Sequence, residues 1–300
     1  MDEFGLIDTF VAQFKVAASP RGPGDDCALI PRQGPSVVTT DALVEGIHFT
    51  RQFTFEDIGH KALAVNLSDL ASMGAKPTWF TVALGLPEDL TATHLKKLGR
   101  GMSALAKAHG AELVGGNVTR SSQLSITITA SGTLDGKPLL RSGARPGDAL
   151  YVSGPLGDAA AGLEGLNPLT PAQRRPTPHL AFGQHARRLC SAAIDVSDGL
   201  AQDLTHLCRA SRVAAELDSA ALPLSDALLD YAGSRRSALP YALTGGEDYV
   251  LLVAVRRPRA FEAAMAKAGF AAEQIGWLRS GTGVKLDGVP MRGRLGFKHR

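Results

Sequence analysis

The 300-residue sequence has few aromatic residues, only 6%, which argues against a surface that stacks nucleic-acid bases. Its three cysteines, Cys27, Cys190 and Cys208, form no C-x-x-C pair, so neither a disulfide framework nor a zinc site is expected. No apolar run approaches the ~18 residues of a membrane span, and the acidic N-terminus lacks the basic start of a signal peptide. We therefore expect a cytoplasmic protein that binds neither nucleic acid nor a membrane.

Several motifs of nucleotide and hydrolytic enzymes are also absent. The sequence has no Walker G-x-x-x-x-G-K-[ST] loop, no G-x-G-x-x-G opening a helix, no H-R-D or D-F-G set, no G-x-S-x-G elbow and no H-E-x-x-H. It also offers no Ser-His or Cys-His arrangement, so no side chain is expected to act as a catalytic nucleophile. A nucleotide would have to be held by metal ions and by glycine-lined turns, for which Gly115-Gly116-Asn117 is a candidate.

What is present is a globular composition, 44% hydrophobic and 20% charged, with a formal net charge of +3 and 33 glycines. Strand-like and helix-like segments alternate through both halves, which predicts an α/β (α+β) architecture. A turn-rich stretch at 141–148 predicts a boundary between a domain at 1–140 and a domain at 141–300. We expect strands at 36–40, 124–130, 149–153, 193–196 and 249–255, helices at 56–73, 91–109 and 258–268 and after Gly157 and Gly199, and an exposed loop at 166–178.

Aspartates recur beside glycine and hydroxyl residues, in G-D-D at 24–26, T-T-D at 39–41, N-L-S-D at 66–69, D-V-S-D-G at 195–199 and G-G-E-D at 245–248. Any one of these is more often a turn or a helix cap, and Asp198 would serve well as an N-cap. Asp41 is expected to end a strand and Asp195 to lie at or near the end of another, so that carboxylates from several strands can converge. Asn66 and Asp69 are expected to share one helix face. Such an oxygen-rich, acidic site suits Mg²⁺.

These motifs together resemble thiamine-monophosphate kinase. The resemblance rests on G-D-D-C-A at 24–28, T-T-D-A-L-V-E-G-I-H-F at 39–49, K-A-L-A-V-N-L-S-D-L at 61–70, L-R-S-G-A at 140–144, I-D-V-S-D-G-L at 194–200 and T-G-G-E-D-Y at 244–249. They occur in the family's order and span nearly the whole chain. The resemblance implies the two-domain aminoimidazole-ribonucleotide-synthetase-like fold, a homodimer formed through the sheet of the first domain, and transfer of the γ-phosphoryl group of ATP to thiamine monophosphate, the last step of thiamine diphosphate biosynthesis.

The family's residue roles carry over by motif. The resemblance implies that several Mg²⁺ ions are bound by Asp25, Thr39, Thr40, Asp41, Asp69, Asn117, Asp195 and Asp198. It implies that ATP contacts Gly116, Asn117, Arg141 and Ser197, and that the thiamine substrate contacts His48, Glu247 and Phe297. The second domain would complete the nucleotide and substrate site. One departure is G-G-N at 115–117, where the family usually has G-G-D, so the metal ligand at Asn117 is uncharged.

Two alternatives remain open at this point. A sister enzyme of the same fold, such as aminoimidazole ribonucleotide or selenophosphate synthetase, would share ATP and metals but use another acceptor. Selenophosphate synthetase is disfavoured because no reactive cysteine matches near the N-terminus. A nucleotide- or thiamine-binding protein without catalysis is favoured only by Asn117. In the kinase reading two phosphates must meet, so Mg²⁺ would neutralise both and align an in-line attack. A general base is dispensable because the acceptor phosphate is already ionised.

Overall fold

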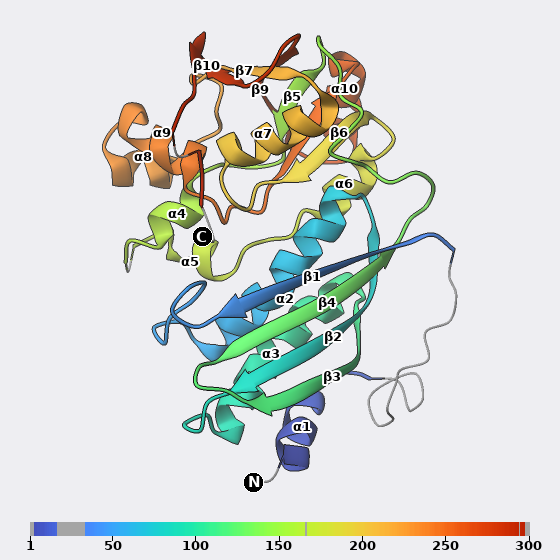
Figure 1. The fold of residues 1–300 in the computed structure, drawn as a ribbon, viewed down its shortest axis with the longest axis vertical. Helices are drawn as coiled ribbons and strands as arrows, with labels where there is room; N and C mark the ends of the chain where they lie inside the picture. The colour runs from blue at the N-terminus through green and yellow to red at the C-terminus, as the bar shows by residue number, and fades with distance from the viewer. Residues whose placement is uncertain (1–2, 17–33, 166, 294, 298–300) are drawn as a thin grey trace. The chain divides into compact units, whose positions relative to one another are not determined.

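The computed structural model describes residues 3–16, 34–165, 167–293 and 295–297. Asp25 and Cys27 lie outside these residues. The chain divides into two compact units, one formed by Met1–Leu70 and Lys76–Asp135, the other by Ala71–Ala75 and Gly136–Arg300. Each unit combines a sheet with helices, so the expected two-domain α/β fold is confirmed (Figure 1). The expected boundary at 140/141 stays a prediction.

The first unit is a four-stranded sheet covered by helices on one face, with α2 and α3 lying behind the strands in Figure 1. The strand order is β1-β4-β2-β3, in which β2 and β3 are parallel and the other pairs antiparallel. Its elements are α1 (Glu3–Val11), β1 (Ser36–Val44), α2 (Phe55–Ser72), β2 (Lys76–Leu86), α3 (Ala92–His109), β3 (Glu112–Arg120) and β4 (Ser125–Thr133). The last two residues of α2 are counted with the second unit.

Helix α3 shows how local sequence sets an element. Thr91 caps its N-terminus in a capping box with His94, and Gly110 ends it at φ 69°, a left-handed conformation that glycine adopts without strain. The predicted helix 91–109 is therefore confirmed. Its partner α2 packs so closely that a Cβ on Gly59 would lie 2.0 Å from the Leu98 carbonyl oxygen. A glycine at this position lets the two helix backbones approach over the sheet.

Two expectations for this sheet are wrong. Asp41 does not end a strand, because β1 continues to Val44 in unbroken antiparallel pairing with β4. Gly115-Gly116-Asn117 is not a turn but the middle of β3, in register with β2. Glycine is needed there for close strand packing, since a Cβ on Gly116 would lie 2.0 Å from the Val82 carbonyl oxygen.

The second unit is a seven-stranded mixed sheet, ordered β11-β10-β7-β9-β5-β8-β6, with helices packed around it. A core of apolar side chains from both sheet and helices includes Leu150, Ile194 and Leu204, all buried. Its elements are β5 (Ala149–Val152), α4 (Asp158–Gly162), α5 (Thr170–Arg174), α6 (Leu180–Ala186), β6 (Cys190–Asp195), α7 (Leu200–Ser211), β7 (Ala214–Leu217), α8 (Asp226–Ala232), α9 (Arg235–Thr244), β8 (Leu251–Val255), α10 (Pro258–Lys267), β9 (Glu273–Arg279), β10 (Val284–Leu286) and β11 (Val289–Pro290).

Most expected elements of this half are confirmed, and one is wrong. The segment 166–178 is not simply an exposed loop, because it contains helix α5 and buries Leu169 and Gln173. Pro171 lies in the first turn of α5, where proline is compatible with a helix. The Pro-rich composition of the segment therefore does not exclude a helix. Among the described helices, none combines the length and apolar character needed to cross a lipid bilayer.

Candidate functional site

In the first unit, polar side chains join β1 to helix α2. The Thr39 hydroxyl donates to Asp69 Oδ2 at 2.5 Å. The Asp41 backbone N–H donates to the side-chain oxygen of Asn66 at 3.2 Å. Asn66 is fully buried and its amide donates to the Ala62 carbonyl oxygen at 3.0 Å, so both ends of this side chain are held. The expected placement of Asn66 and Asp69 on one helix face is confirmed, and the structure brings Thr39, Asp41 and this face together.

The other two candidates of this unit lie on the opposite face of the sheet. The Thr40 hydroxyl lies 2.9 Å from the Thr129 hydroxyl, between neighbours on the uncovered face. Asn117 occupies the same face. It is paired across the sheet with Ala83, Thr127 and Ala42 in turn, and paired residues share a face. Ala42 is two residues from Thr40 in β1, so both lie on the uncovered face. Side chains alternate between faces, so Asn117 and Asp41 point in opposite directions, and three strand spacings of about 4.8 Å separate their strands. One copy of the sheet does not bring them together.

His48 lies in the turn that follows β1. Its Nδ1 accepts a hydrogen bond from the Val44 N–H at 3.0 Å, so the neutral ring carries its proton on Nε2. Its carbonyl oxygen accepts from the Nζ of Lys61, a fully buried lysine, at 3.1 Å. The ring is therefore held in one orientation by its own main chain.

In the second unit, Asp195 is the last residue of β6, as expected, and is buried. The expected N-cap role of Asp198 is wrong, because Gly199 is the cap residue of α7; the Asp198 carboxylate instead accepts from the Gln202 side-chain amide at 2.8 Å. Asp203, inside the first turns of α7, accepts the N–H groups of Ser197 and Asp198 on one oxygen, both at 3.0 Å. Burial raises the pKa of Asp203 to about 7. This carboxyl group fixes the backbone that carries two predicted ligands.

The segment 245–249 lies against the same loop in an unusual conformation. Glu247 and Tyr249 have positive φ angles of 63° and 51°, which are strained for residues with side chains. The Glu247 N–H donates to the Ser197 carbonyl oxygen at 2.7 Å, and its carboxylate accepts from Gln173 at 3.1 Å. The N–H of Phe297 donates to the Asp198 carbonyl oxygen at 2.9 Å. The structure thus brings Ser197, Asp198, Glu247 and Phe297 together.

Asp248 attaches this segment to the start of helix α4. Its carboxylate accepts from the N–H groups of Gly157 at 2.8 Å and Ala159 at 3.4 Å, at the start of α4, where no local side chain caps the helix. Burial raises the pKa of Asp248 to about 8, and the nearby Asp158 and Glu247 act in the same direction, against the hydrogen bonds that lower it. Asp248 is thus a structural neighbour of the predicted substrate residue.

Arg141 is exposed and belongs to the electrostatic surroundings of His206 on α7, together with Arg209 and Asp198. Burial lowers the pKa of His206, and the two arginines lower it further, so the ring is neutral near pH 7. This region has the positive charge that a nucleotide phosphate requires.

Comparison with known proteins agrees with the sequence motifs. The family models of AIR synthase related protein match residues 24–134 with the N-terminal domain and residues 145–288 with the C-terminal domain. The thiamine-monophosphate kinase of Salmonella typhimurium is 42% identical over 96% of this chain and 95% of the relative, and that of Aquifex aeolicus is 36% identical over 100% and 98%. This chain belongs to the thiamine-monophosphate kinase family.

Solved structures of the family superimpose on nearly the whole chain. A thiamine-monophosphate kinase from Stenotrophomonas maltophilia K279a has 39% identity and a TM-score of 0.86, covering 97% of this chain and 98% of that one. A structure described as AaThiL complexed with AMPPCP and TMP has 35% identity and a TM-score of 0.83, covering 99% and 97%. Hydrogenase maturation protein HypE from Escherichia coli, at 23% identity and a TM-score of 0.80, shares the fold.

A family member is expected to bind Mg²⁺, and the donors fit that ion only in part. Within the described residues, no group of three or more His, Cys, Asp or Glu side chains is arranged to hold a metal. Asp41 and Asp69 with the Thr39 hydroxyl offer hard oxygen donors on one side of the sheet. Because Mg²⁺ keeps waters and takes one or two carboxylates together with substrate phosphates, this set fits an ion that arrives with its nucleotide.

Sequence reasoning missed three residues that hold the candidates in place, Lys61, Gln173 and Asp203, and gave Asp248 of the G-G-E-D motif no role of its own. An acidic residue in the first turns of a predicted helix was a signal for Asp203. The thiols play no such part: Cys190 and Cys208 are free, and burial raises the pKa of both, that of Cys208 to about 12. Both are protonated, and hence poor nucleophiles, at neutral pH.

Proposed function

We propose that this chain transfers the γ-phosphoryl group of ATP to thiamine monophosphate and so forms thiamine diphosphate. The observation that carries the proposal is full-length similarity to kinases of this name together with a family structure described as complexed with AMPPCP and TMP. All the motif residues except the usual G-G-D aspartate are present in this chain.

The proposed roles follow the two units. In the first, Asp41, Asp69 and Thr39 would hold Mg²⁺ and His48 would contact the acceptor. In the second, Asp195 and Asp198 would hold Mg²⁺, Ser197 and Arg141 would contact ATP, and Glu247 and Phe297 would hold the thiamine moiety, whose cationic ring suits an aromatic face. Asp25, outside the described residues, remains a predicted ligand. Bound Mg²⁺ would supply neutralisation of the phosphates. The chain's own contribution is alignment, since an ionised phosphate oxygen needs neither a protein nucleophile nor a general base.

We further propose that Asn117 acts on the nucleotide of a second copy of the chain. Within one copy, Asn117 and Asp41 lie on opposite faces of the sheet and three strands apart. The face that carries Asn117 and Thr40 is covered by no helix among the described residues, and Val38 on it is 59% exposed. A homodimer through this face would bring Asn117 of one copy to the face that carries Thr40 of the other, and would bury the exposed strand surface.

Complementation tests this arrangement. Asp69→Asn and Asn117→Trp are each expected to be inactive alone, whereas mixed dimers restore one intact site, so random exchange should recover about one quarter of wild-type activity. No recovery after subunit exchange, with mixed dimers detected by native mass spectrometry, would place Asn117 in cis or outside the site.

A coupled ADP assay tests the reaction itself. We expect ADP release that depends on thiamine monophosphate, with thiamine diphosphate as the product in chromatography. ADP release with another phosphorylated acceptor but not with thiamine monophosphate would identify a sister enzyme of the fold. Binding of ATP and thiamine monophosphate by calorimetry without any turnover would show a binding protein instead.

A further inference from the structure

The turn between β1 and α2 is closed by its own backbone. The N–H groups of Ile47 and His48 donate to the Val44 carbonyl oxygen at 3.1 and 3.0 Å, and the Gly46 N–H donates to the Phe49 carbonyl oxygen at 2.8 Å. Gly46 has φ 82°, a conformation that side chains oppose. These bonds define the shape of the turn but do not attach it to the rest of the unit.

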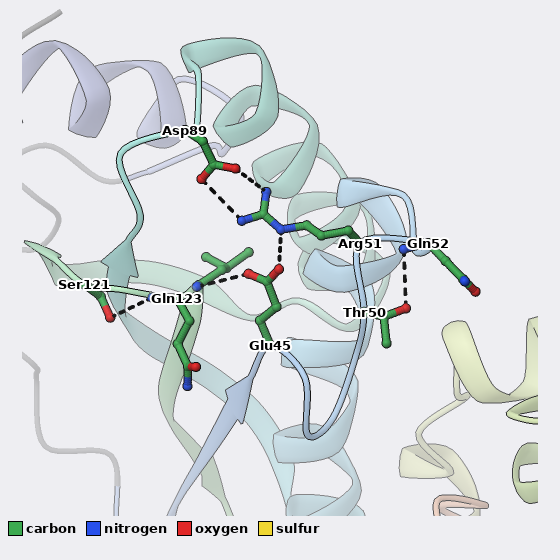
Figure 2. A network of polar contacts seen from close by, with 8 residues as sticks. Glu45, Thr50, Arg51, Gln52, Asp89, Ser121 and Gln123 are labelled. Carbon is green, nitrogen blue, oxygen red and sulfur yellow. Dashed lines mark hydrogen bonds and ion pairs between the residues drawn. The ribbon is translucent and has the colours of Figure 1, made fainter.

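Glu45 makes that attachment. Its N–H donates to the Leu124 carbonyl oxygen at 2.9 Å, and its Oε2 accepts the Leu124 N–H at 3.2 Å, so main chain and side chain hold the same residue beside β4. Its Oε1 accepts from Nε of Arg51, at the other end of the turn (Figure 2). One carboxylate thus joins both ends of the turn to the sheet.

Arg51 extends the network to the loop between β2 and α3. Its guanidinium lies 3.3 to 3.4 Å from the two carboxylate oxygens of Asp89 (Figure 2). The Asp89 side chain is 68% exposed, whereas that of Glu45 is 19% exposed. Water strongly screens the ion pair between Arg51 and Asp89, the outer pair. The inner pair between Glu45 and Arg51 therefore contributes most to holding the turn in place.

A second cation holds the turn from inside. Lys61 is fully buried, donates to the His48 carbonyl oxygen at 3.1 Å, and lies 5.7 Å from the centroid of the Phe53 ring. The turn is therefore fixed by Lys61 beneath it and by Glu45 and Arg51 at its ends. His48 is the residue that this double attachment holds in place.

We propose that Glu45 is a positioning residue for the phosphate acceptor: through Leu124 and Arg51 it fixes the turn that presents His48. This inference rests on the proposed function, in which His48 contacts thiamine monophosphate. Glu45 itself does not touch the substrate. Loss of its carboxylate leaves the main-chain bond to Leu124 and the Lys61 contact in place but removes the link between the two ends of the turn. The turn and His48 then shift, and acceptor binding weakens.

Steady-state kinetics of Glu45→Gln test the proposal. The KM for thiamine monophosphate is expected to rise about tenfold, the scale of one charge-assisted hydrogen bond, with the KM for ATP unchanged. Arg51→Gln should reproduce the effect from the other end of the ion pair. Asp89→Asn is the matched control, because it removes only the exposed outer pair and should leave both KM values within about twofold.

An NMR measurement tests the positioning step without reference to activity. The ¹⁵N shifts of the His48 ring should report the Nε2–H tautomer in both proteins, because the Val44 bond persists, but they should be displaced in Glu45→Gln as the turn moves. Unchanged His48 shifts together with an unchanged KM for the acceptor, or equal rises in both KM values, would overturn the proposal. Failure of the proposed function has a different signature, because the wild-type chain would then show no turnover of thiamine monophosphate.

Discussion

The contact between Asp203 and the loop 197–198 yields a prediction that separates a hydrogen-bonding role from a charge role. Asp203 is buried, and one of its oxygens accepts two backbone N–H groups, of Ser197 and Asp198, both at 3.0 Å. Asp203→Ala removes the acceptor of both donors. Asp203→Asn retains an oxygen in the same position, and because the pKa of Asp203 is about 7, the amide also mimics the neutral form that burial favours.

The expected loss of unfolding free energy follows from the two N–H donors that lose their acceptor. A buried N–H that loses its partner costs about 1–3 kcal/mol, so two cost about 2–6 kcal/mol. Ser197 and Asp198 are only half-buried, so water replaces part of the loss and a value near 2–3 kcal/mol is expected for the alanine variant. The asparagine variant should stay within about 1 kcal/mol of the wild type.

Urea unfolding at pH 7 measures the stability difference, and a titration of initial rate with Mg²⁺ at saturating ATP measures the effect on the loop. We expect Asp203→Ala to need more Mg²⁺ for half-maximal rate and Asp203→Asn to resemble the wild type. The reasoning is refuted if the alanine variant unfolds within about 0.5 kcal/mol of the wild type, or if the two variants are equally destabilised.

Four further predictions use other contacts. Asp69→Asn should abolish most turnover at saturating Mg²⁺ while circular dichroism stays native, because a bridging carboxylate is lost but the Thr39 bond can persist. The pKa of Asp248 is raised to about 8, so the folded state retains a proton that the unfolded state releases above pH 4. The free energy of unfolding of the wild type should therefore fall as pH rises from about 4 to 8, by at most about 1.4 kcal/mol per pH unit. Asp248→Asn lacks this titration, so its free energy of unfolding relative to the wild type should rise over the same range. Gly116→Ala should lower the melting temperature by several degrees, since its Cβ would lie 2.0 Å from the Val82 carbonyl oxygen; an unchanged value would contradict the strand packing. Asn117→Asp should lower the Mg²⁺ concentration for half-maximal rate, and coincident titrations would remove Asn117 from the metal ligands.

Local signals in the sequence were sufficient for much of the fold. The helix at 92–109 could be predicted because its cap residues, Thr91 and Gly110, are adjacent to it in sequence. The half-buried strand at 125–133 showed its alternation directly. The strand at 112–120 could not be predicted, because Gly115-Gly116 is the signature of a turn unless a neighbouring strand requires the absence of side chains. That requirement comes from β2, about 30 residues earlier, and no local pattern reports it.

For the site, the sequence by itself determined the family, the chemical types of the ligands and the helix face shared by Asn66 and Asp69, because these depend on residue identity and short spacing. Only the tertiary structure decided that Asp41 lies within a strand, that Asn117 faces away from it, and that Asp203 rather than Asp198 orders the loop after β6. The physical reason is that strand register, sheet face and buried hydrogen-bond partners are set by contacts between residues distant in sequence, whose entropic cost is repaid only when the whole core forms.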